Sequence, residues 1–526
     1  MKILMVYPKY PDTFWSFRHA LKFVSKRAPF PPLGLITVAP MLPGDWEKKL
    51  IDMNVTSLTD KDIKWADYLF LSAMVVQRDS ALEVIVRSKK LGTKVVAGGP
   101  LFTTGHDEFK DIDHFVLGEA ESSLQPFLAD LSNGHPQPIY TASKFPDITG
   151  TPVPDWSLLD INKYSSMCLQ YSRGCPFDCE FCDIVVLNGH KPRTKSQAQI
   201  LKEMDSLYEH GWRGGLFMVD DNFIGNSKKL KNEILPAIAT WMRKRKFPFV
   251  LSTEASINLA DDEELMRLLT EANFNRVFVG IETPNEESLI ECNKGQNIKR
   301  DLMASVKELH NHGLEVQGGF IVGFDSDPVS IFKNQINFIQ NSGIVTAMVG
   351  LLNAPRGTKL YQRLKGENRL LQNISGDNTD CSTNFSGDNT DCSMNFIPKM
   401  NRDTLLNGYK QILTTIYAPK QYYDRVRNFL ADYQPQKPKG KGRDRLKSYH
   451  VKAFLKSLWL LGIKDRGRRE YWRFLTVTFF KYPRNLPISV YMAIYGYHFR
   501  KVVEKYVTTP INSTFSNQPT NKTNVP

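Results

Sequence analysis

Residues 172–183 of this 526-residue chain read SRGCPFDCEFCD, and the spacing C-x3-C-x2-C brings Cys175, Cys179 and Cys182 into one short loop. A strand-like run, MCLQYS, leads directly into this loop. Three thiolates can bind three irons of an iron–sulfur cubane and leave the fourth iron open to a chelating substrate. The stretch therefore predicts a [4Fe-4S] cluster held by these three cysteines.

Zinc is the alternative metal for this loop, because thiolates also favour zinc. A structural zinc site takes four ligands, commonly from two separated pairs. The nearest further candidates are His190 and Cys168, and Cys168 is more simply a buried small apolar residue of the preceding run. The cluster is the favoured interpretation, and zinc stays the alternative.

Strand-like and helical stretches alternate around the loop, from residue 161 to residue 370. The strand-like runs read MCLQYSRG, GLFMVDD, FPFVLSTE, RVFVGIE, EVQGGFIVGF and TAMVGLL. Six βα repeats predict a partial (β/α)6 barrel whose functional site lies at the carboxyl ends of the strands.

A C-x3-C-x2-C loop after the first strand of such a domain resembles the radical S-adenosylmethionine superfamily. The resemblance implies that the open iron binds the amino and carboxyl groups of S-adenosylmethionine and passes it one electron. Methionine and a 5′-deoxyadenosyl radical are then released, and the protein supplies orientation and exclusion of water. A reducing electron donor of the flavodoxin or ferredoxin type is the implied partner.

Acidic residues and glycines stand at the predicted strand ends. Asp220, Glu254 and Glu282 end the second, third and fourth strands, where the cationic sulfonium and the ribose of S-adenosylmethionine would lie. Each is equally well explained as a helix N-cap. Gly319 is predicted to let the backbone approach the adenine, with simple packing as an equal alternative. Arg356 is a candidate substrate contact or part of a plain turn, and no catalytic residue is assigned.

Residues 1–144 also alternate short apolar runs with helical stretches, which predicts a doubly wound parallel sheet. Residues 145–160, with their spaced prolines, are predicted to be a linker. Small or acidic residues stand at the carboxyl edge of this sheet, where such sheets bind ligands: Ser72, Gly98, Gly99, Gly118 and Glu119. Tight strand-to-helix turns are the alternative explanation for the glycines.

A doubly wound domain before a radical domain resembles the cobalamin-binding class of the superfamily. By that resemblance, the five edge residues contact cobalamin. Many cobalamin domains carry D-x-H-x-x-G after the first strand, and its histidine binds cobalt. Here the position reads YPKYPDTFW, so the histidine is missing and cobalamin would be held without it. A related domain that binds no corrinoid is the alternative.

The C-terminal region carries the basic charge of the chain. Residues 401–526 hold 24 Lys and Arg against 7 Asp and Glu, a net +17, which leaves −4 for the rest of a chain of net charge +13. Residues 401–507 are predicted to be helical, and their mixture of aromatic and basic residues suits peripheral contact with an anionic membrane surface. The alternative is helices packed on the barrel with a solvated basic exterior. No nucleic-acid module is recognised, so no nucleic-acid partner is expected.

Two segments are predicted to lie outside the folded domains. Residues 371–400 contain a tandem copy, SGDNTDCSTNF followed by SGDNTDCSMNF, which predicts an exposed loop whose Cys381 and Cys392 bind no metal. Residues 508–526 are polar and are predicted to be disordered.

The C-terminal region resembles the extension of a subgroup that includes hopanoid C-2 methylases and bacteriochlorophyll side-chain methyltransferases. The resemblance implies a cobalamin-dependent C-methyltransferase that acts on an unactivated carbon of a lipid or tetrapyrrole, an apolar small molecule. The alternatives are radical chemistry without methylation, such as oxidation or cyclisation, and a cobalamin or metal-binding sensor. With no signal peptide and no long apolar run, a cytoplasmic protein is expected, with attachment at the membrane surface as an alternative.

Overall fold

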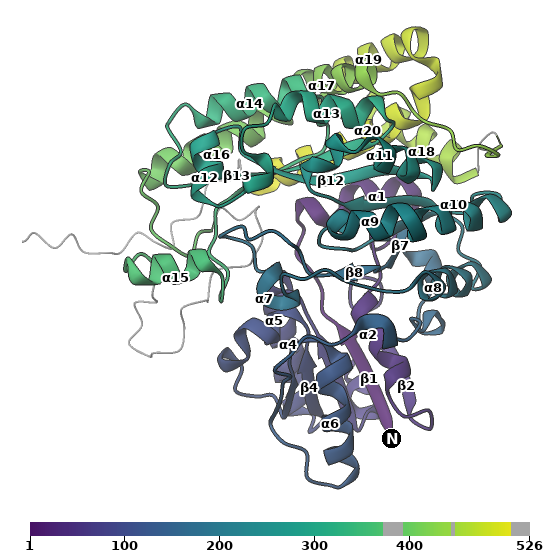
Figure 1. The fold of residues 1–526 in the computed structure, drawn as a ribbon, viewed down its shortest axis with the longest axis vertical. Helices are drawn as coiled ribbons and strands as arrows, with labels where there is room; N and C mark the ends of the chain where they lie inside the picture. The colour runs from purple at the N-terminus through teal and green to yellow at the C-terminus, as the bar shows by residue number, and fades with distance from the viewer. Residues whose placement is uncertain (372–392, 443–447, 507–526) are drawn as a thin grey trace, which may run out of the picture.

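Two parallel sheets organise the computed structural model, which describes residues 1–371, 393–442 and 448–506 (Figure 1). The first sheet has the order β2-β1-β3-β4-β5-β6, and all of its pairings are parallel. Its strands are β1 (Lys2–Tyr7), β2 (Glu47–Asp52), β3 (Tyr68–Ser72), β4 (Lys94–Gly98), β5 (His114–Val116) and β6 (Ile139–Tyr140). The strands are rich in β-branched and aromatic residues that suit a sheet buried on both faces.

Helices cover both faces of this sheet. One apolar cluster joins the sheet to α3 (Asp60–Trp65), α4 (Arg78–Lys90) and α5 (Pro100–Gly105). A second cluster on the other face joins it to α2 (Leu33–Val38) and α6 (Ala120–Ser132). The predicted doubly wound parallel sheet is therefore confirmed.

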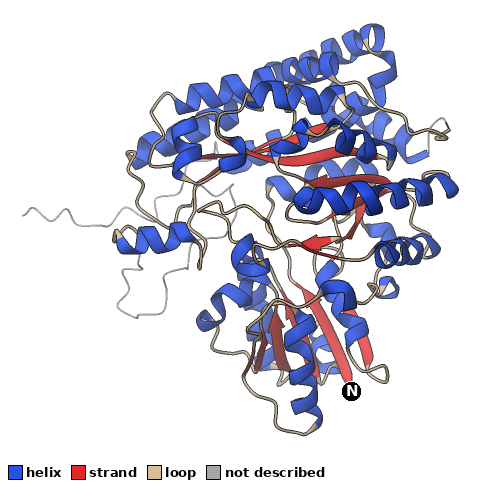
Figure 2. Cartoon of the chain, viewed as in Figure 1, coloured by secondary structure: helices blue, strands red, loops and turns tan. Residues whose placement is uncertain are grey.

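The second sheet has the order β14-β13-β12-β11-β10-β7, and it is also parallel throughout. Its strands are β7 (Ser166–Leu169), β10 (Gly215–Met218), β11 (Val250–Glu254), β12 (Phe274–Glu282), β13 (Glu315–Val322) and β14 (Ala347–Leu351). Its helices are α8 (Gln197–Glu209), α9 (Ser227–Lys229), α10 (Leu235–Lys244), α11 (Glu263–Glu271), α12 (Glu286–Glu291), α13 (Leu302–Asn311), α14 (Ile331–Ser342) and α15 (Lys359–Gly366). Because β7 and β14 are its two edges, the sheet forms the predicted partial (β/α)6 barrel (Figure 2).

Alternation along β12 shows how the sequence builds this barrel. Val277, Val279 and Ile281 are fully buried, whereas the residues between them are partly accessible up to Gly280. A period of two places the apolar set on one face of the strand, toward the covering helices. Asp262 and Asp301 cap the helices that follow β11 and β12, because each side chain accepts a main-chain N–H of the first turn.

A short antiparallel pair and a short helix frame the cysteine loop. The pair is β8 (Ser172–Arg173) with β9 (Arg193–Thr194), and the helix is α7 (Ile184–Asn188).

The C-terminal region is helical, as predicted, and its helices pack against one side of the barrel. They are α16 (Arg402–Ile416), α17 (Pro419–Asp432), α18 (Ser448–Trp459), α19 (Arg468–Lys481) and α20 (Leu486–Tyr506). Tyr409 of α16 donates a hydrogen bond to the Val349 carbonyl oxygen at 3.2 Å, and Tyr417, directly after this helix, donates one to the Ala347 carbonyl oxygen at 2.6 Å. These bonds tie the C-terminal helices to β14. Among the described residues, no helix has both the length and the apolarity needed to cross a bilayer.

Two segments assigned to the N-terminal domain and to the linker pack elsewhere in the molecule. Helix α1 (Arg18–Val24) lies against α18 and α20 (Figure 1), and Phe14 and Phe23 belong to the core of the barrel. Trp156 of the proline-spaced segment is 2% exposed in the same core. The predicted domain boundaries stay predictions. Cys381, Cys392, most of the duplicated loop and residues 508–526 lie outside the described residues.

Candidate active site

The three predicted cluster cysteines lie on one loop between β8 and α7, and main-chain hydrogen bonds fix this loop. The Cys175 N–H donates to the Gly189 carbonyl at 3.2 Å, and the Cys182 N–H donates to the Cys179 carbonyl at 3.1 Å. Cys179 is buried, and the other two are partly exposed. Burial raises the pKa of all three thiols, which is the cost that metal binding would have to offset.

Polar groups from other elements point at these sulfurs. Asn222 Nδ2 donates to Cys175 Sγ and Gln296 Nε2 donates to Cys179 Sγ, both at 3.9 Å. Burial raises the pKa of Cys179, and the charge of Lys294 opposes this rise. Hydrogen bonds to sulfur and nearby charge are the means by which proteins tune iron–sulfur clusters, so the donors fit such a group. Sequence analysis missed Lys294 and Gln296, because no motif marks them and they lie more than a hundred positions downstream.

The two side chains proposed to complete a zinc site lie in different surroundings. Cys168 is a 2% exposed residue of β7, and His190 is exposed with its Nε2 3.9 Å from Asp178 Oδ1. In the described part of the chain, no three His, Cys, Asp or Glu side chains converge as a single metal ion requires.

Asp220 clamps the strand that leads to the cysteines. Its carboxylate is fully buried and accepts the Tyr171 N–H at 3.1 Å and the Ser172 hydroxyl at 2.6 Å, together with the Ser172 N–H. Burial raises the pKa of Asp220 to about 7, although these donors oppose the rise. Asp220 therefore fixes the entry to the loop, and its neighbour Asp221 holds the Gly174 N–H at 3.3 Å.

The other two predicted acids differ from each other in their surroundings. Burial, followed by the charges of Asp221 and Asp220, raises the pKa of Glu254 to about 8. Glu282 lies 6% exposed at a bulge of β12 and pairs with Lys294 at 2.6 Å. A cationic ligand would therefore stabilise the ionised form of Glu254, whereas Glu282 already has Lys294 as its counter-charge.

Gly319 makes room for an aromatic ring. A Cβ at this position would lie 2.9 Å from Cζ of Phe278 and 3.8 Å from Cα of Gly280. The absence of a side chain at Gly319 therefore serves packing between β12 and β13.

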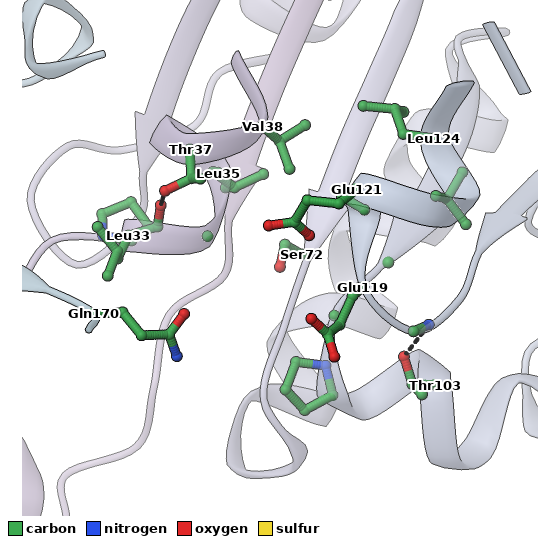
Figure 3. Close-up of a pocket in the computed structure, with 18 of the residues that line it drawn as sticks. Leu33, Leu35, Thr37, Val38, Ser72, Thr103, Glu119, Glu121, Leu124 and Gln170 are labelled. Carbon is green, nitrogen blue, oxygen red and sulfur yellow. Dashed lines mark hydrogen bonds between the residues drawn. The ribbon is translucent and has the colours of Figure 1, made fainter. Parts of the chain in front are cut away.

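A cavity of about 530 Å³ lies between the two sheets, at the carboxyl edge of the first and at the ends of β7 and β10 of the second. All five residues predicted at the edge of the first sheet line it: Ser72, Gly98, Gly99, Gly118 and Glu119. Gln170, Arg173, Val219 and Asp221 line it from the second sheet and its loops. Leu33, Leu35, Val38 and Leu124 add apolar walls (Figure 3).

Two glycines of this wall need backbone conformations that other residues rarely adopt. Gly99 has φ +90°, and a Cβ there would lie 2.7 Å from Ser72 Oγ. Gly118 has φ +74° but nothing within 4 Å of its Cβ position, and its N–H donates to Thr103 Oγ1 at 3.0 Å (Figure 3). The turns thus require glycine, and Gly118 also leaves open space toward the cavity.

Glu119 joins the two halves of the site through ion pairs. Its carboxylate pairs with Arg173 and Arg193 of the antiparallel strands, and Arg173 also pairs with Glu121 at 2.8 Å. These side chains are 7–14% exposed. Although burial opposes it, hydrogen bonding to Arg173 lowers the pKa of Glu121 to about 2. The charged network fixes the cysteine loop relative to the first sheet.

The loop after β1 turns away from the cavity. Of its residues, only Tyr7 at the strand end lines the cavity wall, and no histidine does. Further on, the Phe14 carbonyl is 3.0 Å from Nε2 of His498, and the Phe17 ring packs on Tyr495 of α20. The segment that carries the cobalt histidine in many cobalamin domains therefore packs here against the C-terminal helices.

Arg356 lies at a second cavity of about 700 Å³, beside Asp183 of the cysteine loop. Its guanidinium pairs with Asp107 and Glu108 of the first domain, each at 2.9 Å. The residue lines a cavity and at the same time ties the end of β14 to the first domain.

Comparisons with known proteins agree with this architecture. Residues 169–338 match the Radical SAM superfamily, and residues 358–510 match a domain of unknown function, DUF4070. An uncharacterized methyltransferase of Synechocystis sp. is 41% identical over 475 residues, covering 90% of this chain and 86% of the relative. Hopanoid C-2 methylase of Rhodopseudomonas palustris is 31% identical over 483 residues, covering 90% and 88%.

The fold also occurs in a solved structure, that of the radical S-adenosylmethionine methyltransferase TsrM from Kitasatospora setae with cobalamin and a [4Fe-4S] cluster bound. The match has a TM-score of 0.59 at 14% identity and covers 96% of this chain and 99% of TsrM. At this identity the likeness shows a shared fold. The relatives of higher identity extend over most of both chains, and this chain belongs to the radical S-adenosylmethionine superfamily, in the methyltransferase family that includes hopanoid C-2 methylase.

Proposed function

We propose that this enzyme is a cobalamin-dependent C-methyltransferase that acts on an unactivated carbon of a lipid or tetrapyrrole. The observation that carries the proposal is the cavity onto which the carboxyl edges of both sheets open, beside the cysteine loop. A donor on one sheet and a radical source on the other would meet there. The methyltransferase relatives, and the hopanoid methylase among them, support methyl transfer to an apolar substrate.

On the side of the second sheet, Cys175, Cys179 and Cys182 would hold the [4Fe-4S] cluster. When bound, this group supplies the electron that cleaves S-adenosylmethionine. Asn222 and Gln296 donate to two of the sulfurs, and Lys294 brings positive charge to them. These contacts are proposed to stabilise the anionic thiolates in a site that burial would otherwise disfavour.

The acids at the strand ends are proposed to serve S-adenosylmethionine in different ways. Glu254 offers its carboxylate to the positive charge of this cosubstrate, because among the described residues no Lys, Arg or His forms a salt bridge with it. Asp220 and Glu282 act as positioning residues, the first through Ser172 and the second through Lys294. Gly319 contributes by admitting the Phe278 ring beside it.

On the side of the first sheet, Ser72, Gly98, Gly99 and Gly118 form a wall of small residues that would hold cobalamin without a histidine. Small residues fit a broad, flat ligand because the backbone can approach it closely. Glu119 would act by holding Arg173 and Arg193, and through them the cysteine loop, against this wall.

Anaerobic reconstitution with iron, sulfide and hydroxocobalamin, followed by absorption and electron paramagnetic resonance spectra, tests the proposal. We expect a cluster signal and retained corrinoid in one preparation, and 5′-deoxyadenosine after addition of reductant and S-adenosylmethionine. A flavodoxin or ferredoxin is the proposed donor in the cell. If the protein retains no corrinoid and still forms 5′-deoxyadenosine, methyl transfer through cobalt is contradicted.

Substrate assignment needs a separate measurement. Apolar lipid extracts and tetrapyrroles are incubated with methyl-labelled S-adenosylmethionine, and the products are analysed by mass spectrometry. Label in a product supports methylation and identifies its class. A changed product without label would favour oxidation or cyclisation by the same radical.

A further inference from the structure

The C-terminal helices expose an apolar stripe that the active site does not use. Of the nineteen large hydrophobic residues exposed in the described part of the chain, seven fall within thirty positions: Val451, Leu455, Trp459, Ile463, Trp472, Phe479 and Phe480. They are 45–78% exposed. Scattered single residues of this kind need no explanation, but a concentration of them marks an interaction surface.

Helical geometry makes the stripe continuous. Val451, Leu455, Trp459 and Ile463 follow one another at intervals of four along α18 and the π-helical turn η12 (Leu460–Lys464), so they share one face. Trp472 extends the stripe to α19, because its indole N–H donates to the Gly462 carbonyl at 2.9 Å. At the end of α19, the rings of Phe479 and Phe480 lie 5.3 Å apart.

Exposed cations surround the stripe. Residues 450–485, all of which the structure describes, contain nine exposed Lys and Arg: Lys452, Lys456, Lys464, Arg466, Arg468, Arg469, Arg473, Lys481 and Arg484. The same stretch contains two acids, of which Asp465 is buried and pairs with Arg500, and Glu470 is half-buried. Lys464 lies 5.2 Å from the centre of the Trp459 ring. The charge of this surface is therefore of one sign.

We propose that α18, η12 and α19 dock on the surface of an anionic lipid bilayer, with the stripe inserted among the acyl chains and the cations at the headgroups. Aromatic residues flanked by Lys and Arg are the composition that suits this interface, and the charge selects anionic over zwitterionic lipid. Helix α19 lies at the end of the molecule opposite the N-terminal sheet (Figure 1), so docking leaves the interdomain cavity free.

Docking at a bilayer would bring the enzyme to an apolar substrate that is dissolved there. That link rests on the proposed function, whereas docking itself rests on the surface alone. A second copy of the chain is the competing occupant of an apolar face, but nine cations on each copy would repel one another.

Flotation of the reconstituted full-length protein with vesicles tests the proposal. Vesicles of phosphatidylcholine alone are compared with vesicles that contain about 30% phosphatidylglycerol, at low and high salt. We expect flotation with the anionic vesicles, about tenfold above the zwitterionic ones, and a fall at high salt. No flotation with either vesicle, or equal flotation with both, would overturn the proposal.

Three variants locate the contact. The pair Trp459→Ser and Phe480→Ser, and separately the pair Lys452→Gln and Arg473→Gln, should each lower vesicle binding about tenfold. Val329→Ser is the matched control, since Val329 is 68% exposed outside this surface. Unchanged binding in both double variants contradicts the assignment. A dimer in light scattering that depends on Trp459 and Phe480 would assign the stripe to self-association instead.

The same preparations separate the two proposals. The vesicle assay requires neither corrinoid nor substrate, and 5′-deoxyadenosine formation requires no vesicle. We expect the stripe variants to form 5′-deoxyadenosine as the unaltered protein does, which also shows that they are folded. Loss of corrinoid with intact flotation would count against methyl transfer only, and loss of flotation with intact cleavage would count against docking only.

Discussion

The two parallel sheets present their carboxyl edges to the same cavity, but with opposite kinds of residue. Ser72, Gly98 and Gly118 line it from the first sheet, whereas from the second sheet Asp221 lines it after β10, and Glu254 ends the neighbouring strand β11. A wall of small residues recognises a ligand by shape and backbone approach, while partly buried acids recognise charge. One architecture thus offers two different binding modes, and an enzyme that uses two unlike cofactors needs both.

The largest effect is expected from substitution of a cysteine that is predicted to hold the cluster. Cys179→Ala should abolish 5′-deoxyadenosine formation, because a cubane held by two thiolates loses the anchored geometry on which cleavage depends. Cys292→Ala is the matched control: Cys292 is also buried, and its thiol donates to the Leu289 carbonyl at 3.6 Å. Iron per chain and product by chromatography are measured for both. Equal iron content and activity in the two variants would contradict the assignment.

The next largest effect is expected from a substitution in the charged network that Arg173 and Arg193 form with Glu119 and Glu121. Arg173→Gln leaves Glu119 and Glu121 without a main counter-charge in a largely buried setting, which is expected to lower the free energy of unfolding by about 3–5 kcal/mol. Arg87→Gln removes an exposed pair with Asp60 and should cost about 0–1 kcal/mol. Thermal unfolding measures both. Similar melting temperatures for Arg173→Gln and Arg87→Gln would contradict this expectation, and would show that solvent screens the charges of the network.

The ease of prediction also differs between the two edges. The glycine edge could be predicted from the sequence, because each glycine ends its strand or follows it within two positions, and parallel strands end at one edge. The cysteine loop was equally visible, because its three members are adjacent in sequence. Lys294 and Gln296 were not, since they follow α12 and come near the sulfurs only when β12 and the cysteine loop pack together in the fold. Likewise, Glu119 looked like a ligand contact, and its pairing with Arg193 depends on how the two halves of the chain dock.

A pH experiment sharpens the contrast within the acids. The pKa of Glu254 is raised to about 8 in the folded protein by burial, so the folded state binds this proton more tightly than the unfolded state. The stabilising effect is complete below the ordinary glutamate pKa and is lost as the pH rises toward 8. Glu254→Gln should remove this decline, a change on the order of 4 kcal/mol between pH 4 and pH 8. Denaturant unfolding across this range measures it, and parallel curves for the two proteins would contradict it.

Glu121 should respond in the opposite direction. Its folded pKa is lowered to about 2 by Arg173, so its contribution to stability is present above the ordinary glutamate pKa and is lost as the pH falls toward 2. Glu121→Gln should therefore lower the free energy of unfolding at every pH above the ordinary glutamate pKa, and flatten the acid limb of the stability curve. An unchanged free energy of unfolding in Glu121→Gln at pH 8, measured by the same denaturant unfolding, would contradict this contribution.

The smallest expected effect tests whether the first sheet binds by shape. Gly118→Ala forces a side chain into a left-handed turn, which costs about 1–2 kcal/mol, but the added methyl group meets no protein atom within 4 Å. Its effect on stability should be small, while its effect on corrinoid retention should be larger, because the methyl group enters the space left for the ligand. Gly99→Ala adds the close contact with Ser72 and should be the less stable of the two. The amount of corrinoid per folded chain is measured for Gly118→Ala and for Arg87→Gln at equal melting temperature. A difference between the two variants then reports corrinoid binding and not stability. If Gly118→Ala retains corrinoid fully, glycine is needed at this position only for the backbone conformation of the turn. The contrast between the two edges would then not extend to ligand binding.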